Sequence, residues 1–249
     1  MPITLFRTVI AWMIVLACLC QGCYDTPQQV TLPPTKLSAV DLQFGRQQVD
    51  QMMRDRSEMI SCVQKDDIIY EWATRQFAGE ATGERIYWSA DPPTCPVECL
   101  SSHNPAHEIL GPGLIKIRER HESGPEKGRK IGCEELWSCV VFELYNISYG
   151  KEHNAVYNAA ISGQTGKQQY IIGVAKIEFK AIKETAQFHD EVWRPWSKTK
   201  GKSTEPSYWF TNEPDTYSEW IKQYNDPSGY PYSYYGHEYD SEIAPHIKR

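Results

Sequence analysis

Residues 134–147, EELWSCVVFELYNI, decide more of the predicted fold than any other stretch. Apolar side chains recur in it at spacings of three, four and seven residues, which is the period of one helical face. These side chains are Leu136, Trp137, Val140, Val141, Leu144 and Ile147. The pattern predicts a core-facing helix. Glu143 falls on the same face, and Asn146 lies one turn further on.

A second helix is predicted over residues 168–194, because apolar residues recur there at helical spacing. We expect it to end at Arg194, since the residue before Pro195 disfavours the helical conformation. Its inner face consists of Ile171, Ala175, Glu178, Ile182, Thr185, His189 and Val192. Polar side chains therefore interrupt the apolar face of this helix as well.

Glu143, Glu178 and His189 are the candidate catalytic residues. If the two helices pack antiparallel, the carboxylates of Glu143 and Glu178 meet in a partly buried space. Burial raises the pKa of an unpaired carboxylate, which suits acid–base catalysis or metal binding. A structural hydrogen-bond network is the alternative. Glu178 and His189 are three helical turns apart, too far to share one metal ion.

The rest of the domain is predicted from shorter patterns. Helices are expected at 39–62, with an interruption near Gly45, at 67–77 and, after a capping box at Thr216, to about residue 224. Strands are expected at 85–89 and 114–119, paired around the loop 90–113. The predicted class is α+β, mostly α-helical. Its helices pack around one core, and a small two-stranded antiparallel insertion interrupts them.

The N-terminus is typical of an export signal. Residues 8–20 are nearly all apolar and uncharged, but too few to cross a bilayer as a helix. We therefore predict four parts. They are a signal peptide (1–22), a polar, proline-bearing tether (23–37), a globular mostly helical domain (38–224) and an acidic tail rich in Tyr, Pro and Gly (225–249).

The end of this signal carries the sequence Leu19-Cys20-Gln21-Gly22-Cys23, in which a small residue precedes a cysteine. It resembles a bacterial lipoprotein signal, and Val15-Leu16-Ala17-Cys18 fits the same pattern as an alternative. The resemblance covers about 20 residues. It implies a lipid on Cys23, or on Cys18, that anchors the chain to a membrane. An ordinary cut after Gly22 is the plain alternative.

The cysteines of the domain are disulfide candidates: Cys62, Cys95, Cys99, Cys133 and Cys139. Exported chains tend to pair their thiols, yet lipidation of Cys23 leaves this odd number. Cys133 and Cys139 are the natural distant partners of Cys95 and Cys99, and Cys62 is a further option. A weak zinc set, Cys95, Cys99, His103 and His107, has the wrong spacing, because only three residues separate its middle pair. We predict neither a metal nor a cofactor.

The formal net charge of −6 argues against nucleic acid as a partner. The sequence contains no GxSxG and no HExxH motif. Aromatic residues crowd the C-terminal part, where Trp209, Phe210 and Trp220 either cover the core or, with Tyr230–Tyr239, bind sugars or a partner protein.

The predicted function is that of an exported cell-envelope protein, lipid-anchored or else secreted or periplasmic, with a non-enzymatic binding or structural role. Its expected partners are the membrane, through the lipid, and a protein or a glycan. One alternative is an exported hydrolase that uses buried carboxylates or a metal, which requires the Glu143 and Glu178 carboxylates within about 6 Å of each other in an open cleft. A glycan-binding surface module, which requires exposed rings, is the other. The leading interpretation, a non-enzymatic binding or structural role, predicts no convergent polar pocket.

Overall fold

The computed structural model describes residues 36–93, 100–104, 112–122, 125–224, 226 and 228–247. These residues belong to one unit, Pro34–Arg249. The predicted signal peptide and both candidate lipidation sites, Cys23 and Cys18, lie outside the described residues, so they stay predictions. None of the described helices is both long and apolar enough to cross a membrane.

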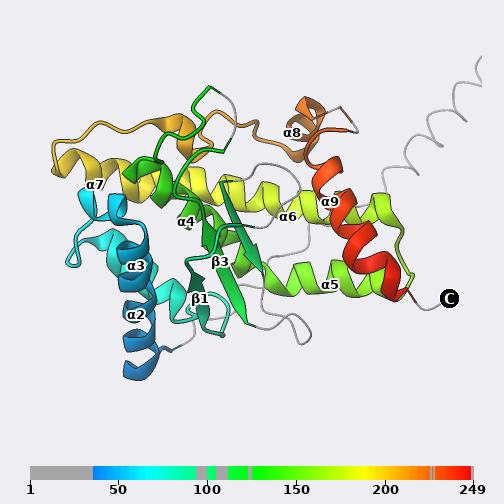
Figure 1. Ribbon diagram of the computed structural model, residues 1–249, viewed down its shortest axis with the longest axis horizontal. Helices are drawn as coiled ribbons and strands as arrows, with labels where there is room; N and C mark the ends of the chain where they lie inside the picture. The colour runs from blue at the N-terminus through cyan, green and yellow to red at the C-terminus, as the bar shows by residue number, and fades with distance from the viewer. Residues whose placement is uncertain are drawn as a thin grey trace, which may run out of the picture. The chain divides into compact units, whose positions relative to one another are not determined.

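The described strands form a mixed three-stranded sheet in the order β1-β3-β2 (Figure 1). β1 (Ile86–Ser89) runs parallel to β3 (Gly113–Ile117), and β2 (Ser101–Asn104) runs antiparallel to β3 on its other side. The predicted class is confirmed, but the two-stranded antiparallel insertion is wrong in detail. The connection between β1 and β3 is long enough for a parallel crossover. β2, Ser-Ser-His-Asn, lacks the apolar alternation that marks a strand in sequence.

Two N-terminal helices pack against each other, α2 (Ala39–Asp55) and α3 (Ile68–Phe77). Ser38 and Asp41 cap α2 reciprocally, and the predicted helix 39–62 ends early, followed by the 3-10 turn η1 (Ser57–Ser61). Gly45 does not interrupt α2. A Cβ atom there would lie 2.1 Å from the carbonyl oxygen of Thr74, so glycine is what lets α2 and α3 approach this closely.

The centre of the fold is α4 (Cys133–Ser148), which packs against both α6 (Lys167–Phe188) and the sheet. α5 (Gly150–Ile161) connects the two and was not predicted, since only Ala160 of its residues is buried. The predicted stop at Arg194 is wrong. A π-helical turn, η2 (His189–Trp193), carries the chain into α7 (Arg194–Thr199), and Pro195 lies in the first turn of α7.

The C-terminal part is helical and packs against α6. η3 (Pro206–Trp209) precedes α8 (Tyr217–Gln223), whose N–H of Glu219 donates to the Thr216 side chain as the capping box predicts. Beyond it lie α9 (Tyr232–Glu238), η4 (Tyr239–Ile243) and η5 (Ala244–His246), coloured red in Figure 1. The sequence predicts no regular structure for these last elements.

The buried residues of the described segments group into three hydrophobic clusters, whereas the sequence predicts one core. The largest joins α2, α3, the sheet and α4 with Phe188 and Trp209. The second places Tyr235 and Tyr239 against Tyr170 and Ile171 of α6, and the third surrounds Trp220. Trp209 and Trp220 are both 0% exposed, so these rings cover the core and offer no surface to a glycan.

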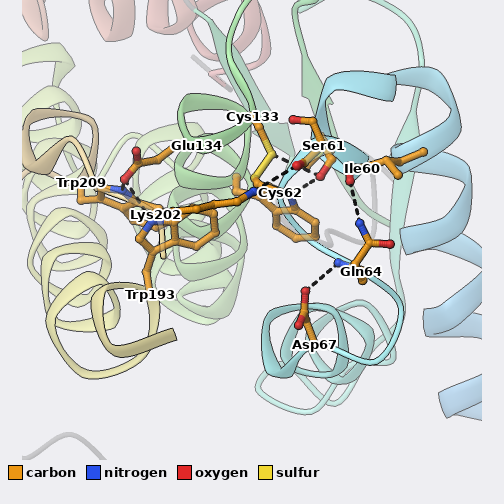
Figure 2. The surroundings of a disulfide bond; sticks show 12 residues. Ile60, Ser61, Cys62, Gln64, Asp67, Cys133, Glu134, Trp193, Lys202 and Trp209 are labelled. Atoms are coloured by element: carbon orange, nitrogen blue, oxygen red, sulfur yellow. Dashed lines mark hydrogen bonds between the residues drawn. A yellow bond between two sulfur atoms is a disulfide. The ribbon is translucent and has the colours of Figure 1, made fainter. Parts of the chain in front are cut away.

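A disulfide between Cys62 and Cys133 joins the end of η1 to the start of α4 (Figure 2). The two cysteines are 71 residues apart in sequence, and Trp137 Nε1 donates a 3.2 Å hydrogen bond to the Met59 carbonyl beside them. Closing a loop of this length stabilises the fold by about 4 kcal/mol in the chain-entropy account. Cys133 thus pairs with Cys62, which the sequence offers only as a further option, and not with Cys95 or Cys99. Cys139 is a free thiol among the described residues, and Cys95 and Cys99 lie outside them.

Candidate functional site

A cavity of about 1560 Å³ lies between α4, α6, β2 and α9. Glu143 and Glu178, the two carboxylates that sequence singles out, both line it. His103 of β2, His153 of α5 and Glu238 of α9 also line the cavity. Its volume exceeds the roughly 300–1,000 Å³ usual for small-molecule pockets, so it has room for an extended ligand.

Glu143 pairs with a histidine from the sheet. The Glu143 side chain lies on the face of α4 that packs against β2, and its Oε2 is 2.6 Å from Nδ1 of His103. Burial lowers the pKa of His103, but the hydrogen bond and the negative charge of Glu143 outweigh it and raise that pKa overall. The direction of this shift favours the protonated imidazole beside the Glu143 side chain in the cavity wall.

Glu178 is held from the other side by the C-terminal helix. The Tyr235 hydroxyl of α9 donates a 2.5 Å hydrogen bond to Glu178 Oε2. Burial raises the pKa of Glu178, and the negative charge of Glu143 acts in the same direction, while the tyrosine hydrogen bonding opposes both. Glu178 therefore holds a proton to higher pH than an exposed glutamate does.

Glu238 is a third carboxyl group in the cavity wall, and sequence reasoning did not find it. The Tyr170 hydroxyl of α6 donates a 2.8 Å hydrogen bond to Glu238 Oε2. Burial raises the pKa of Glu238 to about 7, even though this hydrogen bond opposes the shift. The group therefore changes its charge close to neutral pH.

Several cavity-lining side chains have buried hydrogen-bonding atoms without a partner among the described residues, including those of Asn146, His153 and Ser233. Asn146 is 1% exposed, and within the described part of the chain neither Oδ1 nor Nδ2 has a hydrogen-bond partner. Nε2 of His153 is buried and, among the same residues, equally without one. Burial and the nearby positive charge of His103 lower the pKa of His153 to about 3, so its imidazole is neutral. Leaving such a group unpaired costs about 1–3 kcal/mol, so its presence in a cavity wall calls for an explanation.

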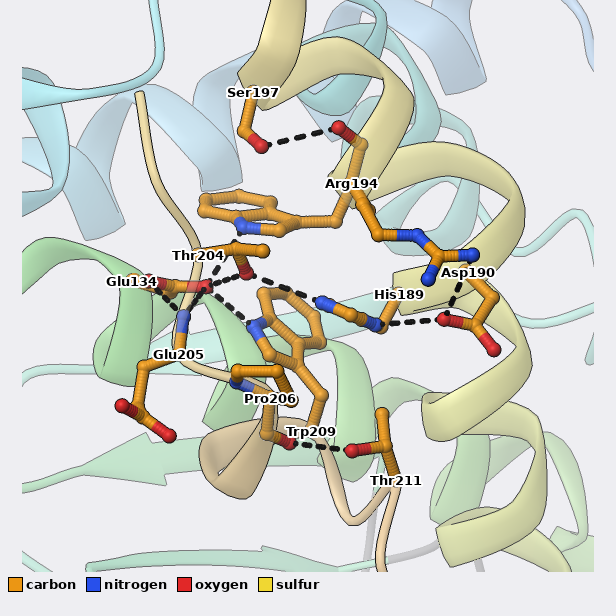
Figure 3. A network of polar contacts seen from close by, with 11 residues as sticks. Glu134, His189, Asp190, Arg194, Ser197, Thr204, Glu205, Pro206, Trp209 and Thr211 are labelled. Carbon is orange, nitrogen blue, oxygen red and sulfur yellow. Dashed lines mark hydrogen bonds and ion pairs between the residues drawn. The ribbon is translucent and has the colours of Figure 1, made fainter.

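The third candidate, His189, is not among the cavity-lining residues. Its Nε2 lies 3.1 Å from Thr204 Oγ1 and its Nδ1 lies 3.0 Å from Asp190 Oδ1 (Figure 3). Thr204 donates in turn to Glu134, which also accepts from Nε1 of Trp209 at 2.9 Å. This arrangement ties the loop after α7 to the start of α4. For His189, the structure therefore shows the hydrogen-bond network that was the alternative to a catalytic role.

No three described His, Cys, Asp or Glu side chains converge as a metal-ligand set. Of the weak zinc set, His103 pairs with Glu143, whereas Cys95, Cys99 and His107 lie outside the described residues. In the zinc-binding motif HExxH, two histidines one helical turn apart flank a glutamate and two further residues. Residues 142–146, Phe-Glu-Leu-Tyr-Asn, have the glutamate of this motif in place but neither histidine. Phe142 and Asn146 occupy those two positions, and both line the cavity.

The sequence predicts that Glu143 and Glu178 share a partly buried space, but it does not reveal the residues that contact them, His103 of β2 and Tyr235 of α9. It does not reveal Glu238 of α9 as a wall residue either, because neither β2 nor α9 shows a periodic signal. Asn146 does stand out in the sequence beside Glu143, as a polar residue on the same helical face, but not as a ligand contact.

The chain matches no known family model, and neither the curated proteins nor the solved structures contain a significantly similar one. The chemistry of the cavity is therefore the basis for a functional proposal.

Proposed function

We propose that this chain is an exported, lipid-anchored cell-envelope protein that binds a polar ligand in the cavity between α4, α6, β2 and α9. The export signal and the lipoprotein-like cysteine box support the location. The shape and polarity of the cavity support ligand binding. It departs from the sequence-based expectation in one respect, because the binding role expected there had no convergent polar pocket, whereas polar side chains line this cavity.

Asn146 carries the proposal. An amide that is 1% exposed and unpaired among the described residues lowers stability, and folding alone gives no reason to keep it. A ligand that donates to its oxygen and accepts from its nitrogen would remove that cost. Unpaired polar groups retained at the expense of stability are expected where they contact a ligand.

Binding is favoured over catalysis because both candidate carboxylates already have protein partners. Glu143 is paired with His103, and Glu178 accepts from Tyr235. An exported hydrolase is the second candidate. It is favoured by the raised pKa of Glu178 and by Glu238, whose pKa of about 7 suits a general acid near neutral pH. The hydrolase candidate predicts substrate turnover that Glu178→Gln abolishes. The binding proposal predicts that wild type shows no turnover.

The test compares wild type with Asn146→Leu, which keeps the shape of the side chain and removes the amide. Full-length protein in detergent is melted with a pool of random hexapeptides and with a pool of oligosaccharides. We expect one pool to raise the melting temperature of wild type and to leave Asn146→Leu unchanged. The variant alone should melt a few degrees higher, because about 1–3 kcal/mol of unpaired amide is removed. Equal shifts in both proteins, or none in wild type, would contradict the proposal.

Intact mass of the exported protein tests the anchor separately. A chain that begins at Cys23 and carries the added mass of a lipid supports it. A chain that begins there without added mass contradicts lipidation and leaves the cavity proposal unaffected.

A further inference from the structure

We infer that the ligand is an extended, basic peptide segment that adds to the outer edge of β2 and passes over Asn146. This inference rests on the proposed function, because it names the ligand class of the same cavity. Three independent features of the cavity wall lead to it: a strand edge, an amide and an excess of carboxylates.

The first feature is the position of β2 in the sheet. The order β1-β3-β2 places β2 at the end of the described sheet, with β3 on one side of it and no described strand on the other. All four of its residues, Ser101–Asn104, line the cavity. A strand edge beside a cavity offers backbone N–H and C=O groups to an extended chain, which is how sheet edges bind peptides. Neither a small apolar molecule nor a sugar uses such a row of groups.

The second feature is the chemistry of Asn146. Its side chain presents an acceptor and two donors, and a peptide group presents one donor and one acceptor. The two therefore match, and both of the atoms that would pair are buried and unused among the described residues. Asn146 lies one turn beyond Glu143 on α4, and Glu143 contacts His103 of β2. The amide and the strand edge therefore border the same part of the cavity.

The third feature is charge. Five glutamates line the cavity, Glu135, Glu143, Glu178, Glu238 and Glu242, against a single lysine, Lys116. His103 pairs with Glu143, and Glu135 lies 3.5 Å from both Arg129 and His121, so Glu178, Glu238 and Glu242 are the ones without a cationic partner among the described residues. The pKa of about 3 keeps His153 neutral. Lysine or arginine side chains would favour the ionised forms of these three glutamates and be attracted to them, whereas an acidic peptide would meet like charge wherever they are ionised. The expected peptide is therefore basic.

Four soluble probes separate these features: a capped hexapeptide that alternates valine and lysine, its valine–glutamate counterpart, the basic peptide with its backbone amides N-methylated, and chitotetraose as a glycan. Binding to the full-length protein in detergent is measured by titration calorimetry. The N-methylated peptide keeps the charge but cannot donate to a strand edge, so it reports β2 pairing specifically.

We expect the basic peptide to bind at least about tenfold more tightly than both the acidic and the N-methylated peptide. Asn146→Leu should weaken binding of the basic peptide by at least about tenfold, because a peptide group without a hydrogen-bond partner is then buried in the complex. The matched control is Asn158→Leu, an exposed position of α5 that does not line the cavity, and it should leave binding unchanged.

If chitotetraose alone binds and Asn146→Leu removes that binding, the peptide inference is wrong and the cavity remains a ligand site. If the N-methylated peptide binds as well as its parent, pairing with β2 is wrong. If no probe binds wild type, the peptide inference fails. If every probe binds Asn146→Leu as well as wild type, the proposed function fails with it.

Discussion

His103 and Glu143 are 40 residues apart in sequence, yet Nδ1 of one lies 2.6 Å from Oε2 of the other. Their contact fastens β2 to α4 through two side chains that are 15% and 3% exposed. Because the pair is largely removed from water, its partners depend on each other far more than the partners of a surface ion pair do.

Breaking the His103–Glu143 pair should lower the free energy of unfolding. His103→Ala leaves the Glu143 charge buried without its partner, which is expected to lower the free energy of unfolding by about 3 kcal/mol. The double variant His103→Ala, Glu143→Leu should recover part of that loss, since no buried charge remains. Urea denaturation followed by circular dichroism measures both. Lys65→Ala, which breaks an exposed pair with Asp50, is the control and should cost under about 1 kcal/mol. Equal losses for His103→Ala and the control would contradict a buried pair.

Glu238 should make stability depend on pH. Its pKa is about 7 in the folded chain, raised by burial, against 4.5 for an ordinary glutamate. Between these values the folded state binds a proton that the unfolded state has released. Stability therefore falls as pH rises from about 4.5 to about 7, by at most about 3 kcal/mol and less where water at the rim screens the charge.

The measurement is a series of urea curves from pH 4 to pH 8 on wild type and Glu238→Gln. The glutamine variant cannot titrate, so the slope over this window should be smaller than in wild type. His103 contributes a separate slope of the same sign, because its raised pKa adds stability that is lost as pH rises above its ordinary value of 6.5. Identical pH profiles in the two proteins would show that Glu238 is not buried.

The disulfide between Cys62 and Cys133 should account for much of the stability. Replacing both cysteines with alanine is expected to cost about 4 kcal/mol, the entropy of the loop they close. Cys139→Ala removes a thiol that has no disulfide partner among the described cysteines and should cost about 1 kcal/mol. Thermal melts with and without a reductant give the comparison. A wild-type melting temperature that reduction does not change would rule out the bond.

Two substitutions should turn the cavity into a zinc site. In F142H/N146H, two imidazoles one turn apart on α4 would line the cavity that Glu178 also lines, and two histidines with a glutamate are a ligand set that zinc accepts. Calorimetric titration should show Zn²⁺ binding at least about tenfold tighter than in wild type. Adding Glu178→Gln should weaken it again, whereas Asn158→His, an exposed change, should not strengthen it. If F142H/N146H does not bind Zn²⁺, the side chains at positions 142, 146 and 178 do not converge on one point.

The sequence predicts the centre of the fold better than its edges, for a physical reason. α4 and α6 are long enough for their apolar period to show, and that period also places Glu143 and Glu178 toward a common space. β2 has no such signal, since Ser-Ser-His-Asn becomes a strand only through pairing with β3. In the same way, α9 is short and rich in tyrosine, and its packing against α6 decides its conformation. The residues that contact the two glutamates come from these elements, so local patterns could not reveal them.

The walls of the cavity are synthesised in a fixed sequence. β2, α4, α5 and α6 emerge first, and the C-terminal wall segments follow them, α9 with Tyr235 and Glu238 and then η4 with Glu242. Folding during synthesis proceeds from the N-terminus, so a chain stalled before residue 232 could already form the His103–Glu143 pair while lacking the helix that closes over Glu178. A chain that ends before α9 therefore presents the Glu178 carboxyl without the tyrosine hydrogen bond that α9 supplies, so the cavity wall is complete only once the C-terminal helices have been made.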